Sequence, residues 1–151
     1  MGDPWQTFTA ASAEDTVAVG GRIAVALRPG DAVLLIGPLG AGKTCLVRGI
    51  AAALGVAPVA VHSPSFTLVN EYAGRDGLRV VHADGYRLAD GAPLDDLGLE
   101  EAQAEGAILL VEWPRRLTPP DASHTWRVEL TVDEADQRTI HVEPPPARSP
   151  L

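Results

Sequence analysis

The segment Gly37–Thr44, GPLGAGKT, contains Lys43, the only lysine in a chain with eleven arginines. It fits the pattern G-x-x-x-x-G-K-[ST], in which glycines let backbone N–H groups turn toward a polyphosphate. The ammonium of such a lysine reaches the β- and γ-phosphates, a place that the planar guanidinium of arginine fits poorly. The hydroxyl of Thr44 is a suitable Mg²⁺ ligand. The segment therefore predicts a loop that binds a nucleoside triphosphate with Mg²⁺.

The loop, the residue after it and one tryptophan are the expected nucleotide contacts. Trp113 is included because it follows a proposed metal ligand, whereas Cys45 reads by itself as a small packing residue of the next helix. The expected contacts are Gly37, Pro38, Leu39, Gly40, Ala41, Gly42, Lys43, Thr44, Cys45 and Trp113.

A site of this kind needs a carboxylate at the tip of a neighbouring strand, to hold Mg²⁺ or its water shell. Glu112 follows the apolar run ILLV, and Asp84 ends the shorter run RVVHA. Either one alone could be an ordinary strand-end carboxylate. We assign Glu112 to the metal together with Thr44, because its run is longer and more buried in character. Asp84 is assigned to binding the water shell of the metal or to orienting the attacking water.

The segment His62–Tyr72, HSPSFTLVNEY, lies where many proteins with such a loop carry a mobile segment that senses the γ-phosphate. Ser63 and Thr67 supply hydroxyls there. The alternative is an ordinary loop in which Pro64 leads into a strand, and the pattern does not decide between the two.

The elements that must position these residues follow from hydrophobic periodicity. The continuous apolar run Ala32–Gly37 predicts a strand buried on both faces, directly before the loop. A helix follows the loop and stops at Gly55. An earlier helix begins after Ser12, which we expect to cap it, with Asp15 as its capping partner.

The remaining segments predict strands on both sides of this unit. Trp5–Ala10 and Ala107–Trp113 each predict one strand, Ser65–Ala73 with Leu78–Ala83 a hairpin, and Thr125–Glu143 two strands joined by an acidic turn. The expected fold class is α/β: a P-loop NTPase-like sandwich with a mixed, partly parallel sheet and flanking antiparallel strands.

Length and composition predict one domain over residues 1–143 of the 151, followed by a Pro-rich, disordered tail at 144–151. The sequence has neither a signal-peptide pattern nor an apolar run that spans a bilayer, so we expect a cytoplasmic protein without membrane contact. A single cysteine excludes an intrachain disulfide. The net charge of −8 makes the chain a poor candidate for gripping nucleic acid alone, so a partner is expected to hold any nucleic acid.

Several segments together resemble the TsaE (YjeE) family of small bacterial ATPases. They are GPLGAGKTCLVRG, SPSFTLVNEY, HADGYRL, LGLEE and VEWP, in the family order. The resemblance implies an ATPase of the machinery that makes threonylcarbamoyladenosine in tRNA. It implies ATP and Mg²⁺ as ligands and TsaB and TsaD as partner proteins, with tRNA reached only indirectly through the complex.

Carried over residue by residue, the family's metal-binding Thr and Glu fall on Thr44 and Glu112. The acid of its H-x-D-x-Y-R motif falls on Asp84, its first switch loop on Ser63–Thr67, and the Trp after the acid on Trp113. The sequence departs from the family pattern at three positions, where it has Cys45, Ser65 and Gly85.

Two other functions use the same loop. A GTPase reads its base with an N-K-x-D segment, which this chain lacks because Lys43 is its only lysine. A P-loop small-molecule kinase is the remaining alternative. It needs an arginine-rich lid and an acceptor pocket, and Pro114–Leu117 offers two arginines without an obvious lid around them.

Overall fold

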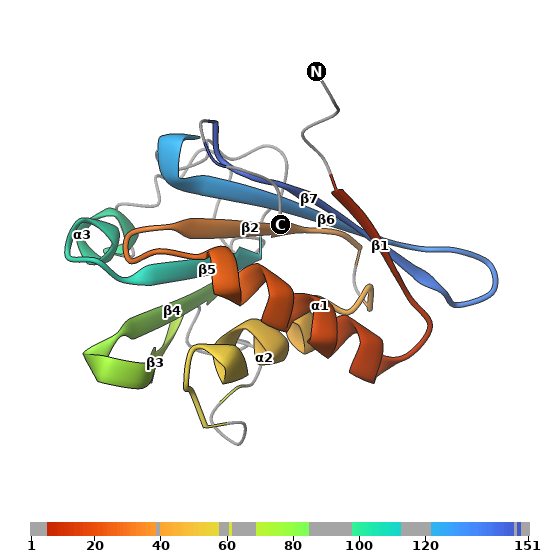
Figure 1. The fold of residues 1–151 in the computed structure, drawn as a ribbon, viewed down its shortest axis with the longest axis horizontal. Helices are drawn as coiled ribbons and strands as arrows, with labels where there is room; N and C mark the ends of the chain where they lie inside the picture. Colours follow the sequence, from red (N-terminus) through yellow and green to blue (C-terminus); the bar gives the residue numbers. More distant parts are fainter. Residues whose placement is uncertain are drawn as a thin grey trace.

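The structure is a computed structural model that describes residues 6–38, 40–57, 61, 69–84, 98–112, 122–146 and 148. In these ranges seven strands form one sheet in the order β1-β7-β6-β2-β5-β4-β3 (Figure 1). The strands are β1 (Gln6–Ala10), β2 (Ala32–Ile36), β3 (Val69–Ala73), β4 (Arg79–Asp84), β5 (Ile108–Glu112), β6 (Thr125–Val132) and β7 (Arg138–Glu143). The helices are α1 (Ala13–Ala26), α2 (Lys43–Ala53) and α3 (Leu99–Ala104).

The centre of the sheet is parallel and its flanks are antiparallel. Strand β2 lies between β5 and β6 and is parallel to both, and β4 is parallel to β5. The outer pairs β1–β7, β6–β7 and β3–β4 are antiparallel. The predicted mixed α/β sandwich is therefore confirmed. Because the parallel strands share one direction, their carboxyl ends meet at one edge of the sheet, the edge where ligands bind in such folds.

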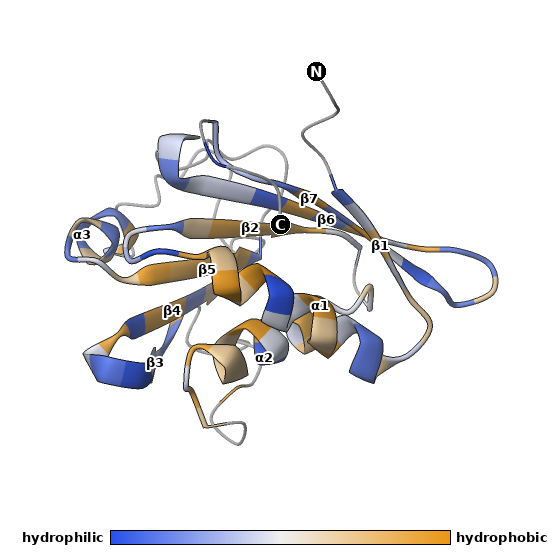
Figure 2. Ribbon diagram, viewed as in Figure 1, coloured by the Kyte–Doolittle hydropathy of each residue, from blue (hydrophilic) through white to orange (hydrophobic). Residues whose placement is uncertain are grey.

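Strand β2 is buried on both faces because its side chains alternate between two cores. Val33 and Leu35 pack in the core that α1 and α2 cover, whereas Ala32, Leu34 and Ile36 pack on the other face, where Leu99 of α3 lies. Figure 2 shows apolar residues concentrated along β2 and β5, with hydrophilic residues at the β6–β7 turn and in β3. The uninterrupted apolar run predicted from the sequence is the consequence of this two-sided burial.

Helices α1 and α2 pack closely through two glycines. A Cβ added at Gly20 would lie 2.7 Å from the carbonyl oxygen of Leu46, and one at Gly49 would overlap the backbone carbonyl of Val17. The backbones can approach this far only because neither residue has a side chain. This contact fixes α2, and with it the loop that precedes α2.

The other helix and strand predictions agree with the structure where it describes them. Ser12 caps α1 by accepting a hydrogen bond from the Asp15 backbone N–H at 3.1 Å, and the Asp15 carboxylate accepts from the Ala11 N–H at 3.1 Å. The predicted hairpins are β3–β4 and β6–β7. Trp5, Ser65 and Trp113 at the ends of the predicted strands lie outside the described residues. Within the described ranges, the helices are too short or too polar for a transmembrane span.

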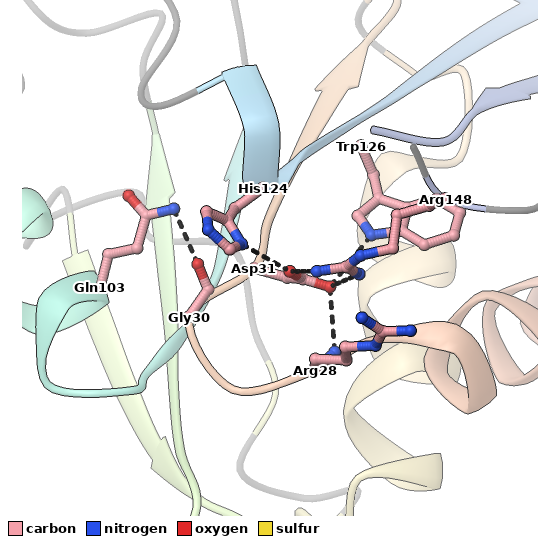
Figure 3. Close-up of polar contacts among 7 residues, drawn as sticks. All are labelled: Arg28, Gly30, Asp31, Gln103, His124, Trp126 and Arg148. Carbon is pink, nitrogen blue, oxygen red and sulfur yellow. Dashed lines mark hydrogen bonds and ion pairs between the residues drawn. The ribbon is translucent and has the colours of Figure 1, made fainter. Parts of the chain in front are cut away.

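A buried ion pair joins the start of β2 to the C-terminal segment. Asp31 is fully buried, and its carboxylate accepts two hydrogen bonds from the Arg148 guanidinium, each at 2.8 Å (Figure 3). Trp126 Nε1 donates to Asp31 at 3.1 Å, and the Arg28 backbone N–H donates at 2.9 Å. Burial by itself raises the pKa of Asp31, but the bonds from Arg148, Arg28 and Trp126 outweigh it, so this pKa lies below its ordinary value.

Arg148 belongs to the segment 144–151, for which the sequence predicts disorder. In the structure Pro144 and Pro145 are buried, and Arg148 is bound to Asp31. Ala147 and residues 149–151 of the segment lie outside the described residues. The boundary of the domain at residue 143 and the disorder of those residues stay predictions.

Candidate functional site

The glycine-rich loop leaves β2 at the carboxyl edge of the parallel strands. Its turn is closed by a hydrogen bond from the Ala41 N–H to the Pro38 carbonyl at 3.1 Å. Gly40 and Gly42 have φ angles of 82° and 102°, which residues with a side chain rarely adopt, so glycine is required at the second glycine of the pattern, Gly42, and at the additional Gly40. Gly42 is the N-cap of α2, and among the described residues no side chain caps that helix end. The first turn of α2 therefore faces the loop with backbone N–H groups, as an anion site requires.

Lys43 is the first residue of α2, and its side chain folds back over the loop. It is 8% exposed, and its Nζ donates to the carbonyl oxygens of Gly37 at 2.5 Å and of Pro38 at 3.2 Å. An ammonium has three donors that rotate freely about one stem. Phosphate oxygens placed over the loop would compete with these carbonyls for the same donors.

Glu112 ends β5 at the same edge of the sheet. In the register of the sheet it lies opposite Leu35 of β2 and opposite Asp84 of β4. Glu112 is 7% exposed although it is a carboxylate. The sheet thus brings the two predicted acidic residues to adjacent strand ends, next to the strand that carries the loop. The side chain of Asp84 lies outside what the structure describes.

The donor set at this edge suits Mg²⁺. Thr44, half-buried in the first turn of α2, offers a hydroxyl, and Glu112 offers a carboxylate. Among the described residues no group of three or more His, Cys, Asp or Glu side chains could hold a metal by itself. Mg²⁺ does not require one, since it binds through one or two protein oxygens together with substrate phosphates and water.

Four of the predicted site residues lie outside the described part of the chain: Leu39, Ser63, Thr67 and Trp113. Their assignments stay predictions. Cys45 is half-buried in the first turn of α2, directly after Thr44. His82, which reads as a structural histidine in the sequence, is buried in β4, and its Nδ1 lies 3.4 Å from the Tyr72 hydroxyl.

Sequence reasoning missed one basic residue beside the loop. Arg138 opens β7, and its Nη2 lies 3.5 Å from the Gly40 carbonyl oxygen. The two residues are 98 positions apart, and no motif surrounds Arg138. Arg138 reaches the loop because β6 pairs with both β2 and β7, which brings the β6–β7 hairpin to the edge of the sheet where the loop lies.

Comparison with known proteins gives the same assignment from several directions. Residues 10–140 match the family model described as threonylcarbamoyl adenosine biosynthesis protein TsaE. The chain is 37% identical to the tRNA threonylcarbamoyladenosine biosynthesis protein TsaE of Treponema pallidum, over 87% of this chain and 95% of that protein. The chain is also 41% identical to the protein of the same name from Bacillus subtilis, over 90% of this chain and 82% of that protein.

This chain belongs to the TsaE family. A solved structure agrees: the crystal structure of Bacillus subtilis YdiB superimposes with a TM-score of 0.69 at 27% identity, covering 93% of this chain and 86% of that one. The resemblance seen in the motifs is confirmed, and it extends beyond them, since the match to the TsaE model runs on through β6 into β7.

Proposed function

We propose that this TsaE-family chain is the ATP-binding and ATP-hydrolysing component of the machinery that makes N6-threonylcarbamoyladenosine in tRNA, acting with TsaB and TsaD in the cytoplasm. The observation that carries the proposal is the placement of Lys43. The only lysine of the chain lies at the N-terminus of α2, folded over a glycine-rich loop, at the edge of the sheet where Glu112 ends β5.

The loop, the start of α2 and the residues around them have distinct tasks in binding the nucleotide. Lys43 leaves the Gly37 and Pro38 carbonyls and binds the β- and γ-phosphates through its ammonium. The N–H groups at the start of α2 bind the same phosphates, helped by the helix dipole. Beyond the described part of the chain, Ser63 and Thr67 sense the γ-phosphate, and Trp113 lies near the nucleotide.

Thr44 and Glu112 hold Mg²⁺ in this account. A bound Mg²⁺ neutralises charge on the β- and γ-phosphate oxygens. The carboxylate of Glu112 is largely shielded from bulk water, and this low-dielectric setting would strengthen its attraction for a bound cation. Asp84, at the adjacent strand end, orients the attacking water or binds the metal's water shell.

The experiment that tests this function is a calorimetric titration with Mg·ATP and Mg·GTP. We expect binding of ATP that exceeds binding of GTP by at least about tenfold, a difference of roughly 1.4 kcal/mol. Equal affinity for the two nucleotides would leave a general phosphate-binding role and remove the assignment of ATP as the preferred nucleotide. A chain that binds neither would reject the proposal altogether.

The alternative of a small-molecule kinase differs in its need for an acceptor. A kinase transfers the γ-phosphoryl group to a small hydroxyl or similar group, whereas an ATPase transfers it to water. We expect phosphate release from ATP in buffer without any small acceptor. Nucleotide turnover that stops when small metabolites are removed, and that proteins do not restore, would favour the kinase.

A further inference from the structure

The turn between β6 and β7 is tightly held by one aspartate. The Asp133 carboxylate accepts hydrogen bonds from the backbone N–H groups of Ala135 at 2.9 Å and Gln137 at 2.8 Å. The Asp133 N–H donates to the Gln137 carbonyl at 2.9 Å. The turn is acidic and exposed, yet its backbone is fixed by this network. The backbone of Arg138, which directly follows the turn, is therefore held in a defined position.

The Arg138 side chain returns along this turn and reaches the phosphate loop. Its Nη1 donates to the Asp136 carbonyl at 3.0 Å and lies 3.5 Å from the Asp136 carboxylate. Its Nη2 lies at hydrogen-bonding distance, 3.5 Å, from the Gly40 carbonyl oxygen. The Arg138 side chain is 23% exposed and that of Asp136 83% exposed. Arg138 is thus half-buried between the turn and the loop.

Arg138 also covers the outer side of Gly42. A Cβ placed at Gly42 would lie 3.6 Å from Arg138 Nε, and 3.7 Å from the Thr16 methyl group of α1. The peptide between Gly40 and Ala41 is held from two sides, since its carbonyl faces Arg138 and its N–H donates to Pro38. The β6–β7 hairpin and α1 thus both lie against the loop at Gly42.

We propose that Arg138 is a positioning residue for the nucleotide, which braces the phosphate loop through the Gly40 carbonyl. The inference rests on the function proposed above. A glycine-rich loop loses more conformational freedom on ordering than any other backbone. A brace that fixes the loop before the nucleotide arrives removes part of this entropic cost, so affinity rises without a new contact to the ligand.

The geometry also says which part of the nucleotide depends on Arg138. A loop carbonyl that accepts from a guanidinium points away from phosphate oxygens, which repel it. Arg138 therefore acts on the shape of the loop and not on the γ-phosphate. The ligands that depend on it are all nucleotides with an α,β-diphosphate, and ADP depends on it as much as ATP does.

The test compares Arg138→Gln and Arg138→Lys with wild type and with Arg127→Gln. Arg127 is an exposed arginine on the adjacent strand β6, so its replacement is a control for loss of one positive charge. We expect Arg138→Gln to weaken ATP and ADP binding by the same factor, about 5- to 20-fold, at the low end of the value of one hydrogen bond to a charged group because this bond is long and partly exposed. Arg138→Lys should be intermediate, because an ammonium lacks the fork that joins Asp136 to Gly40.

Two further readouts separate bracing from other roles. The KM for ATP should rise while kcat changes less than about twofold, since the γ-phosphate is not touched. The melting temperature without nucleotide should stay within about 2 °C of wild type, with only the increase caused by nucleotide reduced.

Several results would overturn the inference. They are equal nucleotide affinity of Arg138→Gln and wild type, weakening of ATP but not ADP, full affinity in Arg138→Lys, or an equal effect of Arg127→Gln. Loss of nucleotide binding through unfolding would show as a lowered melting temperature of the nucleotide-free variant, and would also reject bracing. Failure of the wild type itself to bind nucleotide rejects the proposed function and this inference with it, whereas the other results leave the proposed function intact.

Discussion

At the residue scale, Lys43 donates to two loop carbonyls from a nearly buried position. Lys43→Arg keeps the charge but places a larger planar group where only a compact ammonium fits. We expect at least about a tenfold loss of ATP affinity, measured by calorimetry. Arg48→Lys, the reverse exchange at an exposed position of α2, is the control and should leave affinity unchanged. Wild-type affinity in Lys43→Arg would show that the loop does not need an ammonium.

The two strand-end carboxylates have separate roles in this account. Glu112→Gln keeps the shape of a buried side chain but removes its charge, so ATP affinity should lose most of its dependence on Mg²⁺. Titration with and without EDTA measures this dependence. Asp84→Asn should mainly slow hydrolysis and leave the Mg²⁺ dependence of binding in place. If the Mg²⁺ dependence is instead lost in Asp84→Asn and retained in Glu112→Gln, the two roles are reversed.

Short sequence patterns were enough to predict site residues that lie close in sequence to the end of a single strand. Lys43 was found because its motif lies within eight positions, and Glu112 because a buried strand leads to it. Arg138 and Arg148 could not be found in this way. Their contacts, to Gly40 and Asp31, join residues 98 and 117 positions apart, and only the strand order brings them together. A Pro-rich tail gives no periodic signal for an arginine that pairs with a buried aspartate.

At the scale of elements, the close approach of α1 and α2 positions the loop. Gly49→Ala places a Cβ against the Val17 carbonyl, so we expect a loss of about 1–3 kcal/mol in the free energy of unfolding. Gly21→Ala, in α1, is the matched control, because a Cβ there meets no atom within 4 Å. It should stabilise by about 0.5–1 kcal/mol through helix propensity. Urea unfolding measures both, and similar values for the two variants would contradict this packing.

The pair of Asp31 and Arg148 holds the C-terminal segment against the start of β2. Arg148→Ala leaves a buried carboxylate without its charged partner, although Trp126 and the Arg28 N–H remain bonded to it. We expect a loss of about 2–3 kcal/mol in urea unfolding near neutral pH. Arg79→Ala removes a more exposed partner of Glu71 and should cost much less. An equal effect of the two variants would show that the buried pair does not stabilise the fold.

The same pair makes stability depend on pH with a defined sign. The folded pKa of Asp31 lies below its ordinary value of 3.8, so the folded state favours the charged carboxylate. Its contribution is complete above that ordinary value and is lost as pH falls through the folded pKa. Asp31→Asn should flatten the acid limb of a stability–pH curve below about pH 4. Wild type and Asp31→Asn with parallel acid limbs would contradict this assignment.

At the scale of the whole molecule, a mixed, partly parallel sheet was predictable because its central strands are continuous apolar runs with helices between them, whereas the strand order was not predicted. The chain carries a net charge of −8. This negative charge favours docking on a basic protein surface, and added salt weakens that attraction. Nucleic acid, which is also negatively charged, repels the chain. The tRNA is therefore held by the partner proteins in this account.

The central claim is that this chain hydrolyses ATP slowly alone and faster with its partners. Lys43 is already assigned to binding the β- and γ-phosphates and Arg138 contacts the loop backbone, so the described residues assign no further positive group to the charge that develops on the transferring phosphoryl group. Such a group is worth about 10³–10⁵ in rate. The direct measurement is steady-state phosphate release with and without purified TsaB–TsaD, at low and moderate salt. The account predicts a slow basal rate that the pair raises, less so at the higher salt. Full activity of the isolated chain, unchanged by the pair, would contradict it.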